Sequence, residues 1–268
     1  MPAFLLAVVV GAAIFAPFLA PYDPVAADLK DRNAPPMWYP KGSVRHILGG
    51  DPQGRDVLSR VIYGARISLI VGAVAVSAGM VAGTALGLIS GFLGGLADDV
   101  LMRLVDLSLA IPIILLALVF VVIFGQSFLL LLAILALTSW SRYARQVRAE
   151  VLQLKETDYV ALARVAGASM PRILYRHIFP GVVNTVIVLA SLQIGSLIVT
   201  EAILSYLGAG VPPPTPTWGL MVADGRTYLA SAWWVAFFPG VAIFLTVAAL
   251  NFLGDWMRDK LDPRLRQL

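Results

Sequence analysis

The sequence predicts an all-α integral membrane protein with six transmembrane helices. The chain has 268 residues, of which 59% are hydrophobic and 13% charged, and its mean hydropathy is +0.83. Soluble domains carry charge on about a quarter of their residues, so the excess apolar surface of this chain needs lipid to cover it. Long stretches without a charged side chain then mark the spans, because a helix needs about 20 mainly apolar residues to cross the bilayer.

The third charge-free stretch, 107–141, has 35 residues and would be about 52 Å long as one helix. We therefore divide it at Gly125-Gln126-Ser127, which brings Arg103 and Asp106 into one span at i,i+3, where they can pair. The first span lacks the basic start of a signal peptide and is expected to remain uncleaved. The expected spans are about 3–20, 67–92, 100–124, 128–147, 178–203 and 233–254.

Basic residues predict the orientation of the spans. The segment 148–177 and the C-terminal tail are rich in Lys and Arg, so the positive-inside rule places both in the cytoplasm, together with both termini. The loops 21–66 and 205–230 are then external. The loop 21–66 carries seven bases of its own, and we expect it to be folded or to lie on the membrane surface.

Four glycines recur at every fourth position of the second span, at 79, 83, 87 and 91. They share one face, where small residues let a neighbouring helix approach closely. That neighbour is either another helix of this chain or a helix of a second subunit.

The cytoplasmic segment 148–177 predicts a short helix-turn-helix. Thr157-Asp158 can cap a helix over Tyr159–Val165, Gly167 can end it, and Pro171 can begin the next helix. Small alanines on its exposed side, namely Ala161, Ala163, Ala166 and Ala168, would suit a shallow groove on another protein. The alternative is a solvated amphipathic linker.

The run ALARVAG at 161–167, followed by Pro180, resembles the EAA loop of importer-type ABC permeases. In that family the loop is a coupling helix that docks into a cleft of the ATP-hydrolysing subunit. Ala161 stands where the motif has its glutamate, so a salt bridge from that position to the ATPase is not expected, although the docking shape can survive. The resemblance implies a coupling role for Asp158, Tyr159, Ala161, Ala163, Arg164, Gly167, Ala168 and Ser169.

Further strings resemble the C-type subunit of dipeptide and oligopeptide permeases, whose relatives include nickel and glutathione permeases. They are LAPYDP at 19–24, HILGGDPQGRDVLSRVIYGARISL at 46–69, SGFLGG at 90–95, SYLGAGVPPPTPTWG at 205–219 and NFLGDWMRDKLDPRL at 251–265. Such subunits begin with a basic cytoplasmic stretch, whereas this chain starts almost inside its first span, which favours a missing or misplaced start.

The resemblance implies an assembly in the bacterial inner membrane: this chain, a second permease subunit, two ABC ATPase subunits and an external substrate-binding protein. ATP and Mg²⁺ would bind to the ATPases, because the chain has no G-x4-GK[ST] phosphate loop. The sequence contains no cysteine and two histidines, His46 and His177, so we expect no catalytic, cofactor or metal site on this chain. The small net charge of +4 selects no nucleic acid.

Polar residues inside the spans are candidates for the translocation pathway. Glu201 follows 24 residues without a charge and should face a cavity or a hydrogen-bonding partner. Asn184, Gln193 and Asn251 could line the pathway or join helices. One alternative function is a proton-coupled secondary transporter with Glu201 as carrier. An intramembrane hydrolase is disfavoured, since no nucleophile-base pair or aspartate pair occurs in the spans.

Overall fold

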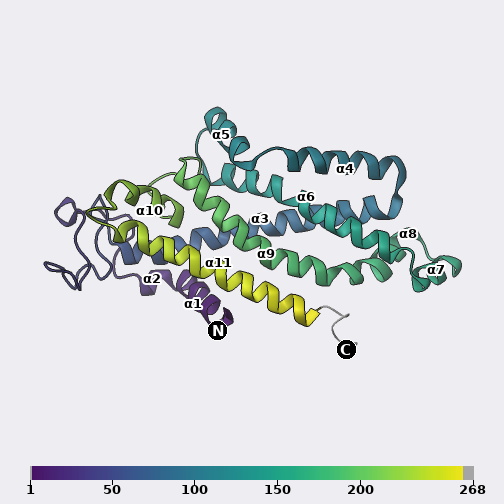
Figure 1. The fold of residues 1–268 in the computed structure, drawn as a ribbon, viewed down its shortest axis with the longest axis horizontal. Helices are drawn as coiled ribbons and strands as arrows, with labels where there is room; N and C mark the ends of the chain where they lie inside the picture. The colour runs from purple at the N-terminus through teal and green to yellow at the C-terminus, as the bar shows by residue number, and fades with distance from the viewer. Residues whose placement is uncertain (1, 262–268) are drawn as a thin grey trace. The chain divides into compact units, whose positions relative to one another are not determined.

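The computed structural model describes residues 2–261 of the chain, and within that range it consists of helices and turns with one isolated bridge between Gly50 and Asp56 (Figure 1). The predicted all-α membrane fold is confirmed. The elements are α1 Pro2–Ile14, α2 Ala16–Leu19, η1 Leu29–Asp31, α3 Val57–Leu93, α4 Gly95–Ala110, α5 Ile113–Phe124, α6 Phe128–Leu154, α7 Asp158–Val165, α8 Met170–Ile173, η2 Leu174–Ile178, α9 Phe179–Tyr206, α10 Trp218–Gly225, η3 Arg226–Tyr228 and α11 Trp234–Leu261.

Four helical stretches among the described residues are long and apolar enough to cross a membrane. They are Val57–Leu93, Phe128–Leu154, Met170–Tyr206 and Trp234–Lys260. A fifth is the pair α4 and α5 taken together, which is bent by 80°. α1 is a shorter apolar helix of 13 residues.

The single helix predicted over 100–124 is broken in the structure between Ala110 and Ile113. Ile111 is extended, with φ −84° and ψ 119°. Pro112 explains the break, because a proline pushes the preceding residue out of the helical region and supplies no N–H. The helix predicted over 3–20 is interrupted at Phe15, and a new helix begins at Ala16 with Pro17 in its first turn, where a proline is tolerated because the N–H it lacks has no partner there.

α3 begins at Val57, ten residues before the expected span, because Asp56 caps it. The Asp56 carboxylate accepts two hydrogen bonds from Ser59, one from its backbone N–H at 2.8 Å and one from its side-chain hydroxyl at 2.7 Å. This satisfies a donor that the helix itself leaves unpaired. The last part of the 21–66 loop therefore belongs to a long helix.

The chain forms two compact units. Among the described residues, the first contains 2–73, 117–132 and 194–252, and the second contains 74–116, 133–193 and 253–261. Two apolar clusters organise the first unit. One surrounds Trp218, and the other surrounds Trp234, whose indole donates to the Gly50 carbonyl at 3.1 Å. The 21–66 loop is thus folded, as one of the two expected alternatives.

In the second unit the row of glycines on α3 packs against α6 of the same chain. A Cβ at Gly83 would overlap the Trp140 carbonyl, and one at Gly87 would lie 2.7 Å from the Ala144 carbonyl. Gly79 and Gly91 meet α6 in the same way, at Ser139 and Val151. These contacts favour the intrachain reading of the glycine face.

Two acidic residues of α4 pair with arginines of α6. Asp98 accepts two hydrogen bonds from Arg148, at 2.5 and 2.6 Å, and one from the Ser90 hydroxyl. Asp106 pairs with Arg145. The expected pairing of Asp106 with Arg103 is therefore replaced by one with Arg145, because the basic run of α6 lies within reach of α4.

Candidate functional site

The segment between α6 and α9 forms the predicted helix-turn-helix. Thr157 occupies the N-cap position of α7 with extended backbone angles, φ −78° and ψ 150°, and its hydroxyl donates to the Leu154 carbonyl at 2.5 Å. Asp158 in the first turn and Arg164 in the last turn both complement the helix dipole. The Thr157 side chain therefore makes no capping bond to an N–H of α7, because its hydroxyl bonds back to α6, and the expected cap at Thr157-Asp158 is limited to the backbone position of Thr157 and the charge of Asp158.

Gly167 ends α7 in a Schellman motif. Its φ is +78°, a left-handed conformation that glycine adopts without a Cβ penalty. The N–H of Gly167 donates to the Arg164 carbonyl at 3.1 Å, and the N–H of Ala168 donates to the Ala163 carbonyl at 3.0 Å, as this motif requires. Pro171 then lies in the first turn of α8, where its missing N–H costs nothing.

α7 has one buried side and one exposed apolar side. Val160 is fully buried, together with Ile173 and Ile178 of the following helices. On the other side Tyr159, Leu162 and Val165 are exposed, Leu162 by 68% and Val165 by 87%. We call these three side chains the α7 face. A row of exposed large apolar side chains on a helix too short to span lipid is typical of an interaction surface.

The predicted alanines contribute less to this surface than expected. Ala161 and Ala166 are exposed, whereas Ala163 and Ala168 are half-buried. The side chains of Asp158, Arg164 and Ser169 are exposed around the α7 face. The Tyr159 ring lies 6.5 Å from that of His177, so contacts with η2 also fix the orientation of α7. His177 itself is half-buried.

Glu201 lies in α9 and is fully buried in the first unit. Its carboxylate accepts the hydroxyl of Ser205 at 2.7 Å and that of Ser68, on α3, at 3.3 Å. This arrangement matches the hydrogen-bonded alternative for Glu201, since both carboxylate oxygens have a partner within the fold. The bonds join α3 to α9.

The three other polar candidates differ in exposure. Gln193 is buried, Asn184 is half-buried and Asn251 is exposed. A Cβ added at Gly195 of α9 would lie 3.3 Å from the Asn251 side-chain oxygen of α11. Asn251 therefore lies over a small residue, at a close approach of two apolar helices. A place in the pathway stays a prediction for all three.

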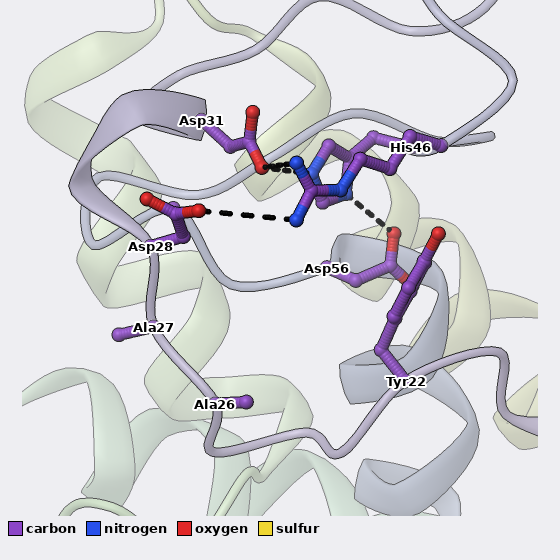
Figure 2. Close-up of a pocket in the computed structure, with 9 residues that line it drawn as sticks. Tyr22, Ala26, Ala27, Asp28, Asp31, His46 and Asp56 are labelled. Atoms are coloured by element: carbon purple, nitrogen blue, oxygen red, sulfur yellow. Dashed lines mark hydrogen bonds and ion pairs between the residues drawn. The ribbon is translucent and has the colours of Figure 1, made fainter.

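A buried histidine cluster in the 21–66 loop was not found by the sequence reasoning. His46 contacts Asp56 through Nδ1 and Asp31 through Nε2, each at 3.1 Å, and Figure 2 shows its ring between the two carboxylates. Arg45 reaches Asp31 at 3.1 Å from the exposed side. The partners lie ten and fifteen residues away in a loop without periodicity, so no spacing rule could have paired them.

A second charged cluster connects this loop with α10. Arg55 donates to Asp51 at 2.6 Å and to Asp224 of α10 at 3.2 Å. The buried Arg60 guanidinium lies 3.5 Å from the same Asp51 carboxylate. Burial raises the pKa of Asp224, against the opposing effect of Arg55 and Arg60. The cluster is a structural link, because each charge has an opposite partner.

Across residues 2–261 no group of three His, Cys, Asp or Glu side chains is arranged to hold a metal ion. The exposed apolar side chains of the α7 face remain the candidate interaction surface.

Comparison with known proteins identifies the family. Residues 83–267 match the family of binding-protein-dependent transport system inner membrane components, and residues 3–36 match the N-terminal transmembrane domain of oligopeptide transport permease C. The chain is 47% identical over 255 residues to the dipeptide transport system permease protein DppC of Escherichia coli strain K12, covering 95% of this chain and 85% of the relative.

It is also 44% identical to the glutathione transport system permease protein GsiD of Pectobacterium atrosepticum, over 95% of this chain and 83% of that protein. A solved chain of the MetNI methionine ABC transporter, in an inward-facing conformation, shares the fold with a TM-score of 0.64 at 19% identity, covering 76% of this chain and 97% of that one. The chain therefore belongs to the inner membrane permease components of binding-protein-dependent ABC importers.

Proposed function

We propose that this chain forms half of the translocation pathway of an ATP-driven importer whose cargo is a di- or oligopeptide. The identity of 47% to a dipeptide permease, sustained over 255 residues, supports this cargo. The relative named for glutathione widens the class only slightly, because glutathione is itself a tripeptide. Nickel is the alternative cargo that the sequence left open.

The proposed assembly has a second permease subunit, two ATPase subunits with bound ATP and Mg²⁺, and an external binding protein that delivers the peptide. The sequence has no phosphate loop, so the nucleotide is held by the ATPases. The assembly lies in the bacterial inner membrane.

The exposed α7 face is the observation that carries the mechanism. We assign it to a cleft of one ATPase, where burial of Leu162 or Val165 would contribute roughly 1.5–3 kcal/mol each. Val160 anchors the opposite side of α7. The chain continues from the turn at Gly167 into a helical stretch of 37 residues, Met170–Tyr206. Movement of the ATPase would thus reach the pathway as a rigid-body displacement.

Binding and ATP hydrolysis test this assignment. The chain, affinity-tagged and produced with its ATPases, should retain them on purification and show vanadate-sensitive ATPase activity. Leu162→Asp should release the ATPases, because it would place an unpaired charge in an apolar cleft. Deletion of residues 158–169 should do the same. Glu156→Gln, at an exposed position outside the α7 face, is the matched control and should behave as the wild type.

If Leu162→Asp retained the ATPases as well as Glu156→Gln does, the docking role of the α7 face would be wrong. If the chain bound no ATPase and catalysed flux alone, the proton-coupled alternative through Glu201 would replace the proposal. Uptake by proteoliposomes of labelled dipeptide, longer peptide, glutathione or nickel, each with the binding protein, would identify the cargo.

The proposed orientation places α7 and both termini in the cytoplasm. Arg258 and Lys260 lie at the end of α11, and the tail bases Arg264 and Arg266 lie outside the described residues. Because the chain lacks cysteine, single thiols introduced at positions 44 and 162 should be labelled from opposite sides of the membrane.

A further inference from the structure

A cluster of aromatic side chains lies where α11 begins. Trp38 and Tyr39 of the 21–66 loop contact Phe238 and Trp234, with ring centres 6.0 and 5.8 Å apart. Trp233 adds a hydrogen bond from its indole to the Tyr39 hydroxyl at 3.0 Å. The cluster thus attaches a segment of the loop to the first turn of a candidate span.

The loop segment is a rigid turn that presents apolar side chains outward. The N–H of Tyr39 donates to the Pro36 carbonyl at 2.9 Å, and the N–H of Gly42 donates to the Tyr39 carbonyl at 2.8 Å. Met37 and Trp38 are about half exposed, Trp38 by 53%. Large apolar side chains held outward on a fixed turn require a partner or a non-aqueous surface.

The exposed surface of the segment continues onto α11. The apolar window of this helix has a mean hydropathy of 2.0, with 28% of its residues buried. Phe237, Phe244 and Phe252 are exposed at spacings of seven and eight residues, so they follow one face of the helix. Phe237 begins that row and contacts Trp233 at 5.2 Å between ring centres.

The composition of the segment fits a bilayer surface. Trp and Tyr are enriched where a span enters the headgroup region, because an apolar ring there carries a polar group that stays hydrated or hydrogen-bonded. Lys41, exposed two residues after Tyr39, adds a cation that anionic lipid headgroups attract.

We propose that Met37, Trp38 and Tyr39, together with Phe237, form an interfacial anchor that inserts into the phospholipid headgroup region at the membrane surface where α11 begins. The anchor holds the folded 21–66 loop against the bilayer and so fixes the height of α11. It depends on membrane insertion of the chain and not on the identity of the cargo.

Spin labelling tests the anchor directly, because the chain has no cysteine of its own. Trp38→Cys would carry a nitroxide in the purified complex, reconstituted in nanodiscs of phosphatidylethanolamine and phosphatidylglycerol. Collisions with oxygen, which partitions into lipid, and with a nickel chelate, which stays in water, are then compared. Val44→Cys, 83% exposed in the same loop, is the aqueous control, and Phe244→Cys, 69% exposed within α11, is the lipid control.

The ratio of oxygen to nickel accessibility at position 38 should shift from the Val44 value toward the Phe244 value. A ratio equal to that of Val44 would overturn the proposal. A label reached by neither reagent in the complex would assign the surface to a protein partner instead and would overturn it as well.

A second measurement uses the fluorescence of Trp38 itself, so the reference protein is the wild type. Lipid brominated near the headgroup should quench a fraction of the tryptophan fluorescence of the wild type. The Trp38→Phe variant should show a smaller quenched fraction, the quenched part of its fluorescence. Trp218→Phe, at a buried position, is the matched control and should leave the quenched part unchanged. An equal quenched part in the wild type and in Trp38→Phe would contradict the anchor.

Discussion

Arg148 on α6 donates from Nε and Nη2 to the two carboxylate oxygens of Asp98 on α4, at 2.5 and 2.6 Å. This bidentate geometry is the strongest form of a side-chain ion pair. Asp98 also accepts the hydroxyl of Ser90 near the end of α3. One carboxylate therefore joins three helices of the second unit.

Replacement of Arg148 by alanine should destabilise this unit by about 1.5–3 kcal/mol, because it leaves the mostly buried Asp98 carboxylate without its charged partner. Thermal unfolding in detergent would measure the loss. Arg145→Ala is the matched control, since Arg145 pairs with Asp106 where both side chains are more than half exposed. Such exposed pairs contribute at most about 1 kcal/mol, so a larger loss at Arg145 than at Arg148 would contradict the assignment.

A bulky residue at Gly83 should separate α3 from α6. The site has no room for a Cβ, which would overlap the Trp140 carbonyl and lie 2.6 Å from the Tyr143 Cβ. We expect Gly83→Leu to cost about 1–3 kcal/mol or more, seen as a lower unfolding temperature and less protein in the membrane. Gly240→Ala, where a Cβ meets nothing within 4 Å, should be tolerated. Equal stability of the two variants would exclude close helix packing at Gly83.

Local backbone rules predicted the helix-turn-helix well, because its signals act within a few residues. Gly167 and Pro171 each set the conformation of their own or the next turn, whereas the Thr157 hydroxyl bonds back to Leu154 and does not cap α7. The Ile111-Pro112 step carries an equally local signal for a break, but the length of the interval and the turn residues Gly125-Gln126-Ser127 predict only the later one. The structure has a break at both places.

Pairings across the fold were less accessible to sequence reasoning. The i,i+3 rule favoured Arg103 for Asp106, but it could not include Arg145 of a neighbouring helix. The same holds for His46, because only the folding of the 21–66 loop brings Asp31 and Asp56 next to its ring. The glycine face of α3 was predictable as a face, and only the structure identifies α6 as the helix that covers it.

Removal of the Asp56 carboxylate should loosen the 21–66 loop and the start of α3 together. Asp56 caps α3 at Ser59 and also contacts the buried His46 ring. Asp56→Ala should cost about 2 kcal/mol or more, the sum of a lost cap and a buried histidine nitrogen, Nδ1 of His46, left without its partner. Faster protease cleavage within the loop would report it.

Asp23→Ala is the control for this variant. Asp23 is exposed in the same loop, where it accepts the N–H of Val25. It should change stability by no more than about 0.5 kcal/mol. Cleavage at the same rate in both variants would show that Asp56 does not hold the loop.

Gly167 offers the sharpest test of coupling, because a side chain added there would strain the backbone without a steric clash. A Cβ at Gly167 would meet nothing within 4 Å, but its φ is +78°, which costs a residue with an ordinary side chain roughly 1–2 kcal/mol. Gly167→Leu should therefore disturb the turn after α7 and uncouple transport from ATP hydrolysis, while insertion into the membrane remains. Asparagine tolerates the left-handed region, so Gly167→Asn should retain coupling. The ratio of peptide transported to ATP hydrolysed in proteoliposomes compares the two, and an unchanged ratio in Gly167→Leu would remove the coupling role of this turn.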